Sequence, residues 1–119
     1  MLPQQHQQAI TLLQESLEQL QNQFTEETSD KMTQTVTFKQ AQQRFDQFLQ
    51  LRDRDVDPSL VSRLQSYVTE IHKQMRLLEM DFRFLQTSRQ TATLQARQTQ
   101  MRSRIATLIR YCRSLLDKS

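Results

Sequence analysis

Histidine, cysteine and paired carboxylates carry most protein catalysis, and this sequence has few of them. His6 and His72 are the only histidines, and neither has a second metal-ligand residue at the spacing of a known metal site. Cys112 lies at helical spacing between Leu108 and Leu115. A free cysteine in such a position packs as a small hydrophobic side chain, so we expect no Cys-His catalysis.

The carboxylate pairs are equally ordinary. Glu15 with Glu18, and Glu79 with Asp81, are close in sequence, but nothing places either pair in a pocket, and exposed acids are common on helices. The chain has no glycine, which excludes the usual glycine-rich phosphate-binding loops. We therefore expect a protein that is not an enzyme and that has no metal site and no cofactor.

Arginine gives the strongest functional signal. Residues 82–116 contain seven arginines and no Asp or Glu, and residues 61–119 hold eleven Lys or Arg against four acids. The first 60 residues have the opposite balance, with five against nine. On a helix, part of this set forms a basic face beside an apolar line, and we take it as the candidate partner-binding face: Arg83, Arg89, Arg97, Arg104 and Arg110.

An acidic protein partner, or the acidic amino half of this same chain, explains this face best. Nucleic acid is a rival partner that we do not expect, because the chain has no reader motif and its net charge is only +3. A membrane-surface helix would need a strongly apolar opposite face, and here the middle of that face is rich in Thr and Gln.

The elements that position these residues are predicted to be helices in a single domain, residues 1–119. The first begins near Pro3, and the polar run TEETSDK ends it, with a second helix starting near Asp30. Both carry apolar residues at spacings of three and four and should pair as an antiparallel hairpin. Asp57 and Pro58 predict the start of the next helix.

From Ser59 to Leu116 there is neither glycine nor proline, and two apolar lines follow one another. The first line reads Val61, Leu64, Val68, Ile71, Met75, Leu78, Phe82 and Leu85. The second, our candidate seam for self-association or a partner, comprises Leu77, Met80, Phe84, Leu94, Met101, Ile105, Leu108 and Leu115.

Two all-α architectures fit these lines. In the one we favour, a coiled-coil-like helix over about 58–117, about 90 Å long, packs on the hairpin and offers the second line to another chain, as in a homodimer. In the alternative, the chain turns near 87–90 and folds back as a four-helix bundle. The lack of a helix breaker favours the former, and the apolar line it leaves uncovered favours the latter or a dimer.

Compartment follows from what is missing. The single cysteine fits a reducing environment, and the amino terminus lacks the basic and apolar regions of a secretory signal. Nowhere do about 18 apolar residues run together, so we expect a cytoplasmic protein without membrane insertion.

Three stretches carry a family resemblance: the MLPQ start, EIHKQMRLLEMDFRFLQTSRQ at residues 70–90, and RIATLIRYCRSLL near the end. Together they resemble PatD, the heterocyst frequency control protein family of filamentous cyanobacteria. The resemblance implies a developmental regulator that acts on cell division by binding FtsZ, the tubulin-like division protein, and altering its assembly. It implies no binding residue. Two rival functions remain: a nucleic-acid-associated regulator of differentiation genes, and a coiled-coil scaffold for another protein.

Overall fold

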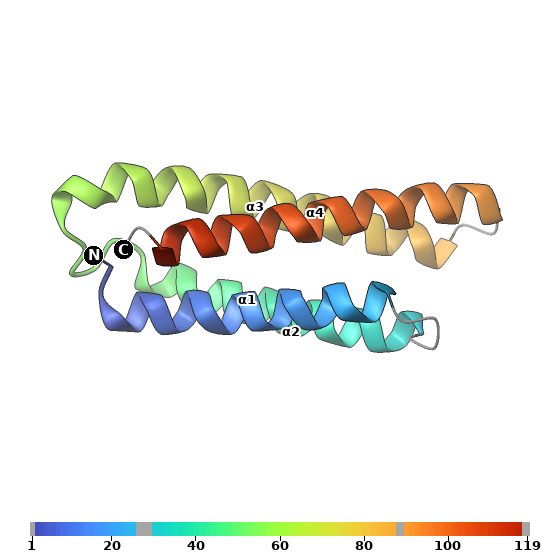
Figure 1. Ribbon diagram of the computed structural model, residues 1–119, viewed down its shortest axis with the longest axis horizontal. Coiled ribbons are helices and arrows are strands. Elements are labelled where there is room, and N and C mark those ends of the chain that lie inside the picture. The colour runs from blue at the N-terminus through green and yellow to red at the C-terminus, as the bar shows by residue number, and fades with distance from the viewer. Residues whose placement is uncertain (1, 26–29, 88–89, 118–119) are drawn as a thin grey trace.

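The computed structural model describes residues 2–25, 30–87 and 90–117. These form four helices, α1 (Gln4–Thr25), α2 (Lys31–Leu51), α3 (Pro58–Thr87) and α4 (Thr91–Asp117). Successive helices run in opposite directions and lie side by side in a bundle measuring 49 × 21 × 21 Å (Figure 1). The predicted all-α class is confirmed.

Side-chain caps explain where two of the helices begin. Asp30 accepts a hydrogen bond from the Thr33 backbone N at 2.7 Å, and α2 starts at the next residue. Asp57 accepts one from the Ser59 backbone N at 2.9 Å, directly before Pro58. Both bonds stabilise the ionised carboxylate and lower the pKa of each aspartate. The predicted starts near Asp30 and at Asp57 are confirmed.

The loop between α2 and α3 is built without glycine. Arg52 has φ of 48° and Asp55 has φ of 60°, a region that costs most residues other than glycine about 1 kcal/mol. His6 holds this loop, because its Nε2 donates to the Arg52 carbonyl oxygen at 2.8 Å and its ring meets Phe48 edge-on. His6 is therefore a structural histidine that ties α1 to the end of α2.

The core runs along the bundle axis. On α4, Met101, Ile105, Leu108 and Cys112 are all 0% exposed. Helix α1 packs against α2 and α4, and α3 packs against α4. The stacked rings of Phe38 and Phe82, 4.7 Å apart, join α2 to α3. The four helices thus form a closed ring in chain order.

The favoured architecture, one continuous helix over residues 58–117, is wrong. Helix α3 ends at Thr87 and α4 starts at Thr91 and runs back along α3, so the chain adopts the four-helix alternative (Figure 1). Burying one large apolar side chain contributes about 1.5 to 3 kcal/mol, and the fold-back buries several from α4. That gain exceeds the few helical hydrogen bonds lost at a turn, even where no glycine or proline interrupts the sequence.

Candidate protein-interaction site

The residues considered for catalysis lie far apart or are sealed. His6 is bound to the loop, whereas His72 is exposed and its ring lies 6.1 Å from that of Phe45. Burial, with a smaller contribution from the nearby Glu18 charge, raises the pKa of the Cys112 thiol to about 12. A buried, protonated thiol is a poor nucleophile. Within the described residues, His6, His72 and Cys112 therefore do not come together in one site.

Neither a cluster of metal-ligand side chains nor a membrane-spanning helix occurs among the described residues. In residues 2–25, 30–87 and 90–117, no three His, Cys, Asp or Glu side chains gather as metal ligands would. Over the same ranges, no helix has the length and apolar character needed to cross a bilayer.

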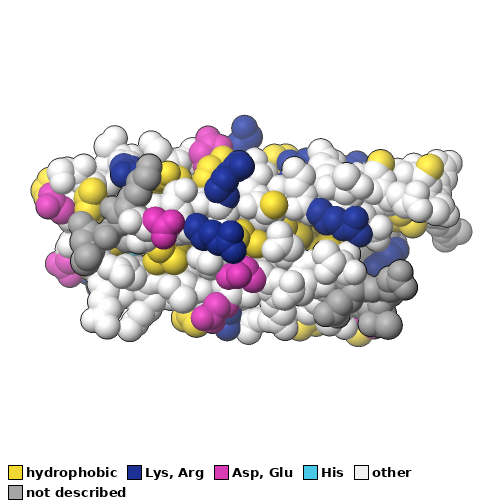
Figure 2. Space-filling model, viewed as in Figure 1, with side chains coloured by type: hydrophobic (Ala, Val, Ile, Leu, Met, Phe, Trp, Pro, Cys, Tyr) yellow, Lys and Arg dark blue, Asp and Glu magenta, His cyan; other side chains and the backbone are white. Residues whose placement is uncertain are grey.

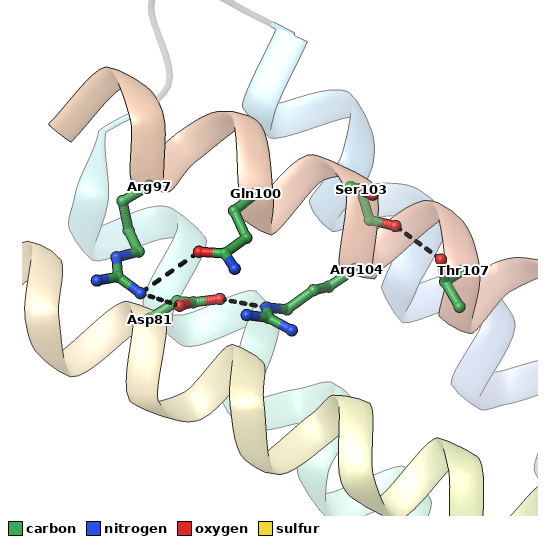
Figure 3. A network of polar contacts seen from close by, with 6 residues as sticks. All are labelled: Asp81, Arg97, Gln100, Ser103, Arg104 and Thr107. Carbon is green, nitrogen blue, oxygen red and sulfur yellow. Dashed lines mark hydrogen bonds and ion pairs between the residues drawn. The ribbon is translucent and has the colours of Figure 1, made fainter. Parts of the chain in front are cut away.

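Asp81 accepts hydrogen bonds from two arginines of another helix. Its carboxylate is buried on α3, and two arginines of α4 reach it from above (Figure 3). Arg97 Nη1 donates to Oδ1 at 2.9 Å, and Arg104 Nε donates to Oδ2 at 2.7 Å. We call these three residues the Asp81 clamp.

The Asp81 clamp fixes how α4 lies on α3. Both carboxylate oxygens are satisfied by charged donors, which is the condition under which a buried charge is tolerated. Removing one partner of such a buried pair costs about 3 to 5 kcal/mol, because an uncompensated charge remains. Two further arginines of α4 reach α1: Arg102 donates to the Phe24 carbonyl oxygen at 3.0 Å, and Arg113 forms an exposed, weaker ion pair with Glu18 at 3.8 Å.

The five arginines predicted to form one basic face therefore do different things. Arg97 and Arg104 belong to the Asp81 clamp, with side chains 30% and 16% exposed. Arg83 is 76% exposed and pairs with Glu79 one turn away on α3. Arg110 is exposed on α4, and Arg89 lies outside the described residues. In Figure 2, basic side chains lie along α4, whereas acidic ones lie at the left end and around the middle of the view.

The eight residues of the predicted seam differ in burial, and some lie in the core whereas others lie at the surface. Most of the carboxyl part is core and is unavailable to another chain, namely Met101, Ile105, Leu108 and Leu115. Leu77 and Leu94 are partly buried, whereas Met80 and Phe84 are 62% and 37% exposed. Only the α3 end of the seam thus remains at the surface.

Met80 and Phe84 lie one turn apart on α3, and cations surround them. Leu77, Lys73 and Arg76 occupy the preceding turns of the same side, with Arg83 beside them. From α4, the Arg97 guanidinium carbon lies 4.1 Å from the centre of the Phe84 ring, a cation–π contact. We call this surface the Met80 face; its members are Lys73, Arg76, Leu77, Met80, Arg83, Phe84 and Arg97.

The side of α3 that faces α2 is hollowed and borders the Met80 face, because Arg76 also lines one of its clefts. A cleft of about 530 Å³ lies between the end of α2 and the start of α3, lined by apolar side chains that include Phe48, Leu64 and Val68. A second cleft of about 500 Å³ follows between the same helices, beside Phe45 and Met75.

Comparison with known proteins adds no identification: no protein-family model, no curated protein and no solved structure matches the chain.

Sequence reasoning missed the Asp81 clamp because it treated Asp81 as one more exposed acid. A signal was present, since Asp81 is the last carboxylate before the seven arginines and lies next to Phe82 of the first apolar line. Its partners, however, are 16 and 23 residues away, and no helical spacing links them.

Proposed function

We propose that this protein is a non-enzymatic regulator that binds an acidic protein through the Met80 face, and that its partner is the division protein FtsZ. The observation that carries the proposal is the exposure of Met80 and Phe84 among cations. Large apolar side chains held at the surface beside arginine are typical of protein interfaces.

The charge of the surface supports an acidic partner. The Asp81 clamp keeps a net positive charge, since one carboxylate serves two arginines. Lys73 and Arg76 form no ion pair within residues 2–25, 30–87 and 90–117. Complementary charge speeds encounter and selects among partners more than it raises affinity.

The resemblance to PatD supports the choice of FtsZ, whose members are acidic, polymer-forming proteins. In this proposal the protein acts in the cytoplasm of a cyanobacterium, binds FtsZ, changes how much of it assembles and so affects division and the frequency of heterocysts. A helical bundle whose Met80 face combines exposed apolar side chains with cations is suited to that role, because such a face can bind an acidic polymer.

The test is sedimentation of purified FtsZ with GTP, with and without this protein. We expect the protein to pellet with the polymer and the amount of pelleted FtsZ to change. If the protein does not pellet with the polymer and the amount of pelleted FtsZ does not change, the choice of FtsZ as partner is refuted.

Charge reversal then locates the surface. Arg76→Glu with Arg83→Glu should abolish co-sedimentation, because both side chains are exposed on the Met80 face. The control is Lys39→Glu with Arg54→Glu, which makes the same change in charge on α2 and the loop after it. Arg97 and Arg104 are unsuitable for this test, because their reversal would leave Asp81 buried among like charges. Equal loss in both pairs would mean that only overall charge matters.

Two other outcomes would favour the rival functions. Retention of the protein on duplex DNA with a steep salt dependence at physiological ionic strength would favour the nucleic-acid regulator. Binding to neither FtsZ nor DNA would favour a scaffold for another partner.

A further inference from the structure

The Met80 face has a second property, which concerns the kind of segment it can hold. We infer that it binds a partner segment that combines an apolar side chain with a carboxylate, and that Arg97 anchors the carboxylate. This deepens the proposed function and rests on it for the role of the surface, but it does not require FtsZ to be the partner.

The first argument concerns Arg97, which is already ordered. Its Nη1 donates to Asp81 Oδ1 at 2.9 Å and to Gln100 Oε1 at 3.4 Å (Figure 3). Its guanidinium carbon also lies over the Phe84 ring. An arginine held from three directions loses little conformational freedom when a ligand arrives, which favours binding.

The second argument is the remaining hydrogen-bonding capacity of Arg97. A guanidinium has five N–H donors, and the bonds just described use only Nη1. The side chain is 30% exposed, so the other donors can meet a partner from solvent. A carboxylate is the group whose two oxygens match this fork of donors.

The third argument concerns the apolar half of the segment. Met80 is flexible and polarisable, and Phe84 offers the part of its surface that Arg97 leaves uncovered; together they can accommodate side chains of several shapes. The surrounding cations disfavour a basic segment. Glu79, the nearest exposed acid on α3, is paired with Arg83 and therefore repels an incoming carboxylate less.

A comparison within the molecule sharpens the choice of occupant. Met32 and Val36 on α2 are 77% and 62% exposed, also one turn apart. The cations nearest to them in the sequence are two lysines, Lys31 and Lys39, and no arginine lies within seven residues of either side chain along the chain. Leu12 on α1 is also 41% exposed. Exposed apolar side chains thus occur on α1, α2 and α3, and an arginine held over an exposed ring occurs at the Met80 face.

The experiment uses three short fluorescein-labelled peptides and fluorescence polarisation with the full chain. One peptide carries Leu and Phe flanked by Glu and Asp; in the second the acids are replaced by Lys, and in the third Leu and Phe are replaced by Ser. We expect only the first to bind. Equal binding of all three, or no binding of the first, would overturn the inference.

Variants assign the contacts. Phe84→Ser should weaken binding of the first peptide about thirtyfold, the size of effect that a central interface residue produces. Arg97→Lys keeps the charge but loses the fork and the ring contact, and should weaken it about tenfold. Met32→Ser is the control and should bind as the unaltered protein does. The thermal midpoint of each variant is measured first, and Arg97→Glu is avoided because of Asp81.

The outcomes separate this inference from the choice of FtsZ. Peptide binding without FtsZ co-sedimentation refutes FtsZ as partner and leaves the inference standing, and the reverse result refutes the inference alone. Light scattering of the free protein supplies one more outcome: a dimer that Met80→Glu converts to a monomer would make a second copy of this chain the occupant and overturn the inference.

Discussion

Helix α3 contacts α4 on one side and α2 on the other, and the two contacts differ in their packing. Towards α4, Asp81 is buried beneath two arginines at 2.7 and 2.9 Å, beside a well-packed core. Towards α2, two clefts of about 530 and 500 Å³ lie between the helices, and the bond from Gln42 to Glu79 is 3.4 Å long. The α4 side of α3, which holds the buried ion pairs, is therefore the side that positions Arg97 beside the Met80 face.

The largest expected effect compares two acids of α3. Asp81→Ala should lower the free energy of unfolding by about 3 kcal/mol, since it removes a buried charge that two arginines of another helix require. Glu79→Ala should lower it by less than about 1 kcal/mol, because that carboxylate is 39% exposed and its ion pair lies within one helix. Urea denaturation measures both, and similar losses would contradict the contrast between the two sides.

A labelling experiment compares access to the bundle core with access to the α2–α3 cleft. Because burial raises the pKa of Cys112 from 9.0 to about 12, its thiolate fraction at pH 8 is lower by about a thousandfold, and we expect almost no reaction with iodoacetamide in the folded protein. Val68→Cys in a Cys112→Ala background places a thiol in the α2–α3 cleft and should react quickly. Slow reaction of both thiols would mean that the cleft is closed in solution.

The same thiol predicts a dependence of stability on pH. Its folded pKa lies above its unfolded value, so the stability it contributes is complete below about pH 9 and is lost as the pH rises towards 12. The thermal midpoint of the unaltered protein should therefore fall more steeply above pH 9 than that of Cys112→Ala. Parallel curves would exclude a sealed thiol.

The smallest expected effect on stability concerns the Asp57 cap at the start of α3, which precedes both the α2-facing and the α4-facing parts of the helix. The hydrogen bond from the Ser59 backbone lowers the pKa of Asp57, so its stabilising contribution is present above the ordinary value of 3.8 and is lost as the pH falls through the lowered pKa. Asp57→Ala should lower the thermal midpoint slightly at pH 7 and leave it unchanged at the acid end. A difference that persists at low pH would assign the effect to something other than the ionised cap.

Local signals in the sequence predicted three of the helix starts. Pro3, Asp30 and Asp57 act through neighbours within a few residues, and their caps or turns are where the sequence placed them. The sequence offered a turn near 87–90 only as the alternative, because no breaker marks it. The choice between one helix and two follows from the burial of the α4 core residues, which depends on packing between helices.

The candidate site was predictable only in part. The periodicity correctly placed Met80 and Phe84 apart from the first apolar line of α3. It could not tell which half of the second line would be buried in the bundle core. Similarly, the arginine count indicated a basic region without showing that Arg97 and Arg104 share one buried acid. Both outcomes depend on which helices pack together. The sequence pattern of a single helix does not contain that information.

The most direct test of the account compares two exposed methionines. Met80→Glu and Met32→Glu make the same chemical change on the outer surfaces of α3 and α2, at residues 62% and 77% exposed. In co-sedimentation with FtsZ and GTP, the account predicts that Met80→Glu abolishes pelleting with the polymer and that Met32→Glu pellets as the unaltered protein does. Undiminished pelleting of Met80→Glu would contradict the claim that the Met80 face binds FtsZ.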